Sequence, residues 1–156
     1  MVEIADILSL DDVVLDLRSC RSKRQVLKEL AERAAAAAHL DPQRLLEALM
    51  ERERLGTTGI GHGIAIPHAR LAELTRLVGL FARLDEPVDF EALDDRPSDL
   101  IFLLLAPDSA DAESLKALAR ISRLLRDPNV QQRLRQEKDR DAVYRMLTQK
   151  PESHAA

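Results

Sequence analysis

The sequence predicts an α/β protein in which helices cover both faces of one sheet. Segments with strand-like composition alternate along the chain with segments whose apolar residues recur at helical spacing, an order typical of α/β folds. Residues 99–105 read Asp-Leu-Ile-Phe-Leu-Leu-Leu, so we expect a strand with both faces buried. The 156 residues are enough for one compact domain and few for two.

The first strand and the first helix are expected near the N-terminus. Val13–Leu17 is rich in β-branched and apolar residues, which favours a strand. Ser22 and Gln25 have the spacing of a capping box, so a helix is expected to begin there. Its apolar residues recur at helical intervals before an alanine run ends at His39.

A second helix is predicted to begin at Asp41 as N-cap, with Pro42 in the first turn, where the missing N–H of proline costs nothing. Gly56 is placed to end this helix in the left-handed conformation. Residues 64–68 follow as a short apolar strand. Pro67 favours the end or the edge of the sheet for this strand, because proline has no N–H for the ladder.

The second half of the chain is expected to add two strands and three helices. The helix that starts near residue 128 repeats the Asp-Pro beginning of the second helix. The predicted segments are strands over 77–84 and 99–105, and helices over 111–125, from 128 onward and over 141–147.

Composition and charge exclude several classes of function. Acidic and basic residues are interspersed, with a net charge of -4, and no basic stripe carries aromatic residues, so nucleic acid is not an expected partner. A single cysteine, Cys20, cannot form an internal disulfide, no Cys/His spacing resembles a zinc site, and we expect neither metal nor cofactor. The N-terminus lacks a signal-peptide pattern and the longest apolar stretch, 100–106, is too short to span a bilayer, which predicts a soluble cytoplasmic protein.

Glycine is concentrated in one place: Gly56, Gly59, Gly61 and Gly63, four of the five glycines, fall within eight residues. Residues without a Cβ can take the alternating φ signs that turn backbone N–H groups into a nest for anions such as phosphate. The loop runs into a strand and lacks the lysine of a P-loop, so neither the dinucleotide motif nor the P-loop motif fits. A purely structural loop is the alternative.

His68 follows this loop and is held by Pro67, whose ring restricts the backbone. A neutral imidazole nitrogen is a competent nucleophile, and a hydrogen bond from the other ring nitrogen to a backbone carbonyl can select the tautomer that exposes it. Phosphoryl transfer to such a nitrogen requires positioning and charge stabilisation, which the fork of an arginine supplies. Arg52 and Arg54 are the candidates, although Arg54 could instead be only a cation that complements the helix macrodipole.

The other histidines give weaker signals. His39 and His154 are interpreted as residues without a chemical role. His62 lies inside the glycine loop. A metal site built from His62 and His68 would need a third ligand, and none has convincing spacing.

The run from Arg52 to His68, Arg-Glu-Arg-Leu-Gly-Thr-Thr-Gly-Ile-Gly-His-Gly-Ile-Ala-Ile-Pro-His, resembles the active-site signature of the fructose/mannitol and nitrogen-related enzyme IIA domains of the bacterial phosphotransferase system. The similarity continues through residues 86–94 and 99–107 and covers nearly the whole chain. It implies one mixed sheet of about five strands flanked by helices on both faces. It also implies a IIA type-2 domain over residues 1–148, and we expect a disordered tail over 149–156.

The resemblance further implies the site. His68 matches the histidine that the family phosphorylates, and Arg52 matches the arginine that lines that site. Sugar-type members have a second histidine at the start of a helix; Ser114 stands in its place here, and a site role and a role in starting the helix both remain open. The phosphate-binding loop would comprise Thr57, Thr58, Gly59, Gly61 and Gly63.

The expected function is that of a phosphocarrier, which accepts its phosphoryl group from a phosphorylated HPr-like protein charged by enzyme I. No IIB domain and no membrane segment is found in the 156 residues, which favours the nitrogen-related regulatory type, with targets such as potassium-transport or sensor-kinase components. The alternatives are a fructose-type IIA that hands its phosphoryl group to a separate IIB protein, and a binding module that lost phosphorylation, a hypothesis prompted by Ser114.

Overall fold

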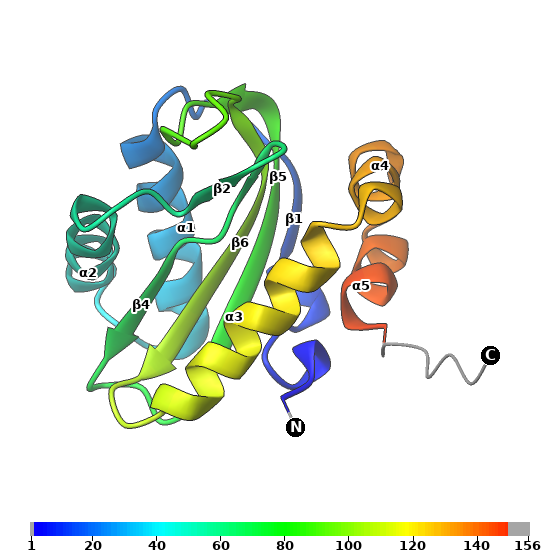
Figure 1. Ribbon diagram of the computed structural model, residues 1–156. Helices are drawn as coiled ribbons and strands as arrows, with labels where there is room; N and C mark the ends of the chain where they lie inside the picture. The colour runs from blue at the N-terminus through cyan, green and yellow to red at the C-terminus, as the bar shows by residue number, and fades with distance from the viewer. Residues whose placement is uncertain (1, 150–156) are drawn as a thin grey trace.

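The computed structural model describes residues 2–149 (Figure 1). The strands are β1 (Val13–Leu17), β2 (Gly59–Gly61), β3 (Ile64–Ala65), β4 (His68–Leu71), β5 (Val78–Val88) and β6 (Ser98–Pro107). The helices are α1 (Lys23–Ala38), α2 (Pro42–Arg54), α3 (Asp111–Leu125), α4 (Pro128–Gln136) and α5 (Arg140–Thr148), with short 3-10 turns at Ile4–Asp6 and Leu10–Asp12. Strands and helices do not alternate along these residues as the sequence predicted, because β1, α1 and α2 are followed by a run of strands, β2 to β6, and then by the helices α3 to α5. The expected tail falls on residues 149–156, of which 150–156 lie outside the described residues.

The described strands form one open mixed sheet in the order β1-β5-β6-β3-β2, and β4 also pairs with β6. Helices α1 and α2 cover one face, and α3, α4 and α5 cover the other (Figure 1). The predicted α/β class, the mixed sheet and the helices on both faces are confirmed. The sheet has six strands where about five were expected, because the glycine segment forms β2 and the segment after it is divided.

Pro67 divides the segment that was expected to be a single strand over 64–68. Both β3 and β4 pair in parallel with β6, Ile64 opposite Leu100 and His68 opposite Leu104. Pro67 cannot donate to this ladder, but its carbonyl accepts a hydrogen bond of 2.9 Å from the N–H of Leu104. The strand therefore restarts at His68, at the edge of the sheet.

The caps predicted for the first two helices are present. The hydroxyl of Ser22 accepts a hydrogen bond of 3.1 Å from the N–H of Gln25, and the carboxylate of Asp41 accepts one from the N–H of Gln43 at 3.3 Å. The left-handed conformation is found at His39, which ends α1 with φ +58°. Gly56, two residues beyond α2, has φ +152°, which also favours glycine.

β6 is buried on both faces, as its composition predicts. Leu100, Phe102 and Leu104 belong to the core under α3, α4 and α5, whereas Ile101, Leu103 and Leu105 belong to the core under α1 and α2. Each of these six side chains is at most 1% exposed. Alternation along one strand therefore supplies both cores.

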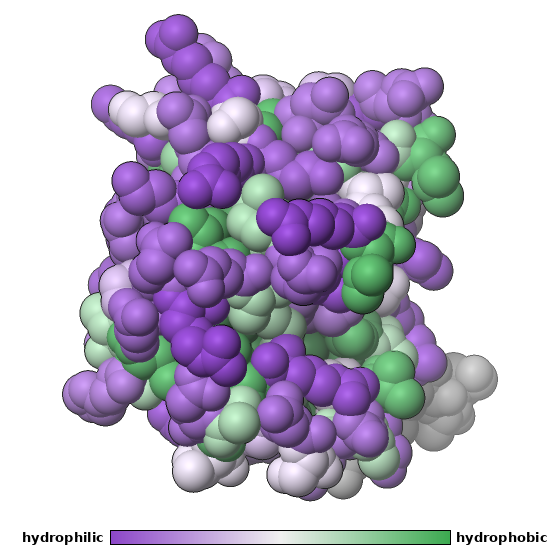
Figure 2. Space-filling view, turned by 90° about the vertical axis from the view of Figure 1, so that its left-hand side faces the viewer, coloured by the Kyte–Doolittle hydropathy of each residue, from purple (hydrophilic) through white to green (hydrophobic). Residues whose placement is uncertain are grey.

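The edge strand β4 lies between two helix ends. α2 packs against it from one side, and the first residue of α3 is joined to it by an ion pair between Arg70 and Asp111. Seen from the side that carries α2, the surface is mostly hydrophilic with scattered hydrophobic residues (Figure 2). Among the described helices, none combines the length and the apolar composition needed to cross a bilayer.

Candidate functional site

The ring of His68 is fixed through its Nδ1 atom. Nδ1 lies 2.8 Å from the backbone carbonyl oxygen of Ile66, two residues earlier. A carbonyl oxygen can only accept a hydrogen bond, so Nδ1 carries the proton in this contact. Pro67 stands between the two residues and restricts the backbone that sets this distance. The local sequence therefore selects the tautomer in which Nε2 has the free lone pair.

Arg52, in the last turn of α2, faces that lone pair. Its Nε–H donates to Nε2 of His68 at 3.2 Å, and its Nη1 donates to the carbonyl of Gly56 at 2.9 Å. An arginine has no acceptor, so Nε2 must be the acceptor, which agrees with the tautomer fixed by Ile66. Among the described residues, only Arg52 and Ile66 form hydrogen bonds with the imidazole.

The surroundings of His68 keep its imidazole neutral. Partial burial lowers the pKa of His68 below its ordinary value of 6.5, and the positive charges of Arg52 and Arg70 lower it further. The hydrogen bond to the Ile66 carbonyl and the charge of Glu53 act in the opposite direction but do not prevail. The side chain is half-buried, so Nε2 belongs to a neutral nucleophile within reach of solvent.

The glycine segment is a hairpin of β2 and β3, and several of its N–H groups already have partners within the chain. The N–H of Thr58 donates to the carboxylate of Glu53 at 3.1 Å, that of Gly59 to the hydroxyl of Thr57 at 3.0 Å, and that of His62 to Asp94 at 2.8 Å. The hydrogen bond from His62 is also the main reason why the pKa of Asp94 is lowered. These N–H groups hold the hairpin in place, as expected of a structural loop.

The glycines themselves allow close packing and positive φ angles. A Cβ on Gly59 would lie 3.1 Å from Cβ of Phe90, and one on Gly63 would overlap the guanidinium of Arg135. Gly61 and Gly63 have φ angles of +95° and +78°, which side chains disfavour. The segment therefore needs glycine for its fold, whatever it contributes to anion binding.

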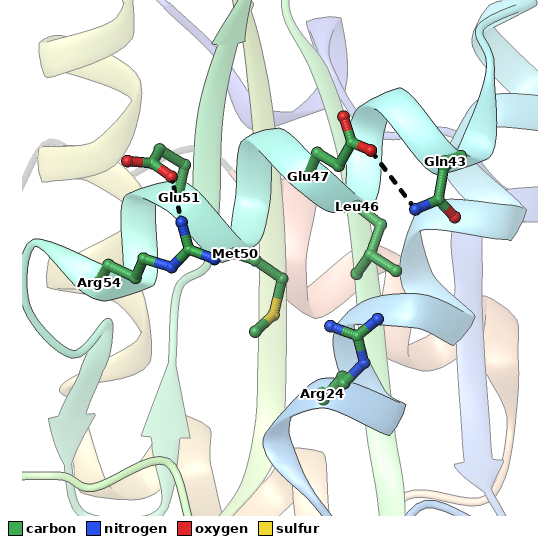
Figure 3. A pocket seen from close by; sticks show the side chains of 7 residues that line it. All are labelled: Arg24, Gln43, Leu46, Glu47, Met50, Glu51 and Arg54. Carbon is green, nitrogen blue, oxygen red and sulfur yellow. Dashed lines mark hydrogen bonds and ion pairs between the residues drawn. The ribbon is translucent and has the colours of Figure 1, made fainter.

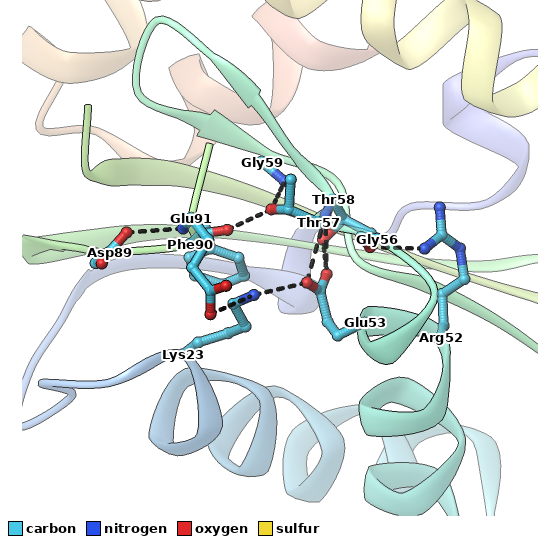
Figure 4. Close-up of polar contacts among 10 residues, drawn as sticks. All are labelled: Lys23, Arg52, Glu53, Gly56, Thr57, Thr58, Gly59, Asp89, Phe90 and Glu91. Atoms are coloured by element: carbon cyan, nitrogen blue, oxygen red, sulfur yellow. Dashed lines mark hydrogen bonds and ion pairs between the residues drawn. The ribbon is translucent and has the colours of Figure 1, made fainter. Parts of the chain in front are cut away.

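Glu53 organises the polar contacts behind the site (Figure 4). Its side chain is 5% exposed, forms an ion pair of 2.9 Å with Lys23 and accepts hydrogen bonds from both the N–H and the hydroxyl of Thr58. The hydroxyl of Thr57 is bound to the carbonyl of Phe90. One carboxylate thus joins the start of α1, the end of α2 and the glycine segment.

Arg54 points away from His68. It pairs with Glu51 at 2.6 Å and lines a groove of about 290 Å³ between α1 and α2 (Figure 3). The groove is lined by Arg24, Gln43, Leu46, Glu47, Met50, Glu51 and Arg54. Arg54 is exposed in the last turn of α2. This position agrees with the interpretation of Arg54 as a cation that complements the helix macrodipole.

Among the described residues, Ser114 and His62 form no hydrogen bond with the imidazole. Ser114 is buried in the first turn of α3, and His62 is exposed at the hairpin turn with φ +57°. His154 lies outside the described residues. Within residues 2–149, no group of three or more His, Cys, Asp or Glu side chains is arranged to hold a metal ion.

The family model of the phosphoenolpyruvate-dependent sugar phosphotransferase system, EIIA 2, matches residues 6–150. The chain belongs to this EIIA 2 family. The resemblance seen in the sequence is thereby confirmed.

Relatives of this EIIA 2 protein include several named nitrogen regulatory proteins. The one from Bradyrhizobium diazoefficiens is 48% identical over 144 residues, covering 92% of this chain and 94% of the relative. The one from Escherichia coli is 41% identical over 130 residues, covering 83% of this chain and 80% of the relative. The crystal structure of nitrogen regulatory protein IIA-Ntr from Neisseria meningitidis matches with a TM-score of 0.89 and 35% identity, covering 93% and 99% of the two chains. This EIIA 2 protein is therefore similar to the nitrogen regulatory type.

Sequence reasoning missed two groups around the imidazole of this EIIA 2 protein. Glu53 stands inside the signature run, but a glutamate near a helix end is usually exposed, so nothing indicated its burial. Arg70 follows His68 by two residues, a spacing that places both side chains on one side of a strand. That spacing was the available signal for a second cation near the site.

Proposed function

We propose that this EIIA 2 protein is a phosphocarrier whose acceptor atom is Nε2 of His68, with a phosphorylated HPr-like protein as the donor. One observation carries the proposal: Ile66 and Arg52 together hold the neutral imidazole in the tautomer that presents Nε2. The lowered pKa of His68 keeps this form abundant at neutral pH.

The transfer needs only the groups described. The lone pair of Nε2 attacks the phosphorus, the bond between phosphorus and the donor's leaving group breaks, and its electron pair stays with the donor. The ring gains positive charge as the new N–P bond forms. The Nδ1 proton remains hydrogen-bonded to the Ile66 carbonyl, which offsets that charge.

Arg52 serves as the stabilising cation. Its Nε–H occupies the Nε2 lone pair before the reaction, so the guanidinium must pass from the nitrogen to the phosphoryl oxygens as the N–P bond forms. The required movement is small because the guanidinium is already in contact with the acceptor atom. A planar fork can bind two of those oxygens at once.

The nitrogen-regulatory relatives support a signalling role for the phosphoryl group. Nearly two negative charges added at the sheet edge change which proteins can dock there. Target proteins such as potassium-transport or sensor-kinase components, and a cytoplasmic location, belong to the same proposal. The second candidate is transfer to a separate IIB protein, since one solved fold neighbour is a complex of the mannitol IIA of Escherichia coli with phosphorylated IIB.

Phosphoryl labelling tests the proposal. The protein is incubated with phosphoenolpyruvate, enzyme I and an HPr-like carrier, and its intact mass is measured. We expect one acid-labile phosphoryl group on the wild type and on His62→Ala, and none on His68→Ala. If the wild type is not labelled, the proposal is wrong and the alternative of a binding module that lost phosphorylation is favoured. If His68→Ala is still labelled, the acceptor is a residue other than His68.

A further inference from the structure

We propose that Arg70 is a second guanidinium that binds the phosphoryl group on His68, after leaving its ion pair with Asp111. The proposal rests on the proposed function of His68. Two observations support the inference. His68 and Arg70 lie on the same strand, β4. In the structure Arg70 forms an ion pair with Asp111, the first residue of α3.

His68 and Arg70 project from the same side of β4. Ala69 and Leu71, between and beyond them, are buried in the core under α1 and α2, so the alternation of the strand turns His68 and Arg70 the other way. The Cα atoms of residues two apart on a strand are separated by roughly 6.6 Å, which an arginine side chain can span. The charge of Arg70 already acts on the imidazole, since it contributes to lowering the pKa of His68.

The present partner of Arg70 holds it weakly. The side chains of Arg70 and Asp111 are 45% and 70% exposed, and exposed ion pairs contribute little because water screens them. A phosphoryl group carries nearly two negative charges and three acceptor oxygens, so it is a stronger partner for a guanidinium than one carboxylate. Phosphorylation of His68 is therefore expected to draw Arg70 away from Asp111.

Asp111 tolerates the loss of its partner. It is in the first turn of α3, where the helix macrodipole favours a negative charge. The exchange thus leaves no buried charge unpaired. It also breaks the described ion pair between β4 and α3 and joins the phosphoryl group to Arg52 on one side and Arg70 on the other.

The equilibrium constant for phosphoryl exchange with the HPr-like carrier tests this exchange of partners. Arg70→Gln is expected to lower the constant about tenfold, the effect of losing one charge-assisted hydrogen bond, and Arg70→Lys to restore part of it. Asp111→Asn is expected to raise the constant about two- to fivefold by freeing Arg70. In the double variant Arg70→Gln/Asp111→Asn the effect of Asp111→Asn must vanish, because it acts only through Arg70.

A second ion pair offers a matched control. Arg44 on α2 pairs with Glu73 at 2.7 Å, and both side chains are exposed, at 57% and 41%. Arg44→Gln and Glu73→Gln should leave the exchange constant unchanged. If Arg70→Gln behaves like Arg44→Gln while His68 is still labelled, the inference about Arg70 is wrong and the phosphocarrier function stands. If the wild type takes no phosphoryl group on His68, both are overturned.

Discussion

Nε of Arg52 lies 3.2 Å from Nε2 of His68, so the cation proposed to stabilise the phosphoryl group already contacts the proposed acceptor atom in the unphosphorylated protein. The carbonyl of Gly56 holds the other end of the guanidinium at 2.9 Å. Helix end, loop and imidazole are thus fixed to one another by a single side chain. This relationship makes the contribution of Arg52 separable from that of the neighbouring Arg54.

Arg52→Gln should slow phosphoryl transfer without moving the label. Removing a preorganised positive donor from a developing anionic centre costs about 10²- to 10³-fold in rate. Rapid-quench labelling with the phosphorylated carrier measures this rate. Arg54→Gln, which removes a charge two residues away in an exposed pair with Glu51, should leave the rate unchanged. Equal slowing in both variants would show a general effect of charge.

The pKa of His68 is predicted to lie below 6.5 in the folded protein, chiefly because the ring is partly buried. Only the neutral ring reacts, so the labelling rate should fall on acidification and reach half of its plateau at a pH below 6.5. Arg52→Gln should move the pKa upward because it removes one of the charges that lower it. Proton and nitrogen NMR of the ring report both the pKa and the proton on Nδ1. A native pKa at or above 6.5 contradicts the prediction.

The same lowered pKa links His68 to stability. The unfolded chain binds a proton near the ordinary value of 6.5, whereas the folded chain binds it only at lower pH. His68 therefore favours the folded state above the unfolded pKa, and this contribution is lost as the pH falls from 6.5 through the folded pKa. Urea unfolding of the wild type and of His68→Gln at about pH 7.5 and 5.5 measures it. The wild type should lose more stability than the variant on acidification.

Glu53→Gln should destabilise the fold by about 1–3 kcal/mol, because the partly buried Lys23 loses its closest counter-charge. Glu91 lies 3.5 Å from the same ammonium but is 76% exposed, so it compensates only in part. Urea unfolding gives the difference in free energy. Glu51→Gln, on the same helix in an exposed pair, is the control and should change stability by less than about 0.5 kcal/mol. A similar loss in both variants would remove the special role of Glu53.

Ser98→Ala should leave stability unchanged or raise it by about 1 kcal/mol. Ser98 is 0% exposed, and its hydroxyl is the one buried side-chain polar atom in residues 2–149 without a hydrogen-bond partner. Thr58→Val is the opposite case, because it removes a buried hydroxyl that is bonded to Glu53, and it should be destabilising. Thermal unfolding of the two variants checks both signs. Destabilisation by Ser98→Ala would mean that the hydroxyl has a partner.

The sequence could predict most of the elements because their signals are local. The capping residues and the two Asp-Pro starts mark helices, and the continuous apolar run of β6 marks a strand buried on both faces. β2 could not be predicted in this way. Its three residues include two glycines, and it is a strand only because it pairs with β3 and packs beside Phe90.

The candidate site likewise has features that the sequence could predict and features that it could not. Arg52 and Arg54 are two residues apart and therefore roughly 200° apart around the helix, so the spacing shows that only one can face the imidazole but not which one. The folded chain decides this by packing α2 against β4. The partners of Glu53 and Arg70 are likewise set by contacts between residues distant in sequence, 30 residues apart for Lys23 and 41 for Asp111.

By itself, the sequence determined the class of fold, the family signature and the histidine proposed as acceptor, because backbone restriction by Pro67, helix capping and apolar periodicity act over a few neighbouring residues. The contact between Arg52 and His68, which the resemblance had implied, is made by the tertiary structure, and only the tertiary structure decided which carboxylate is buried and which N–H groups of the glycine segment are already engaged. Those features depend on contacts between elements that are far apart in the sequence, and these contacts form only when the two hydrophobic cores are packed.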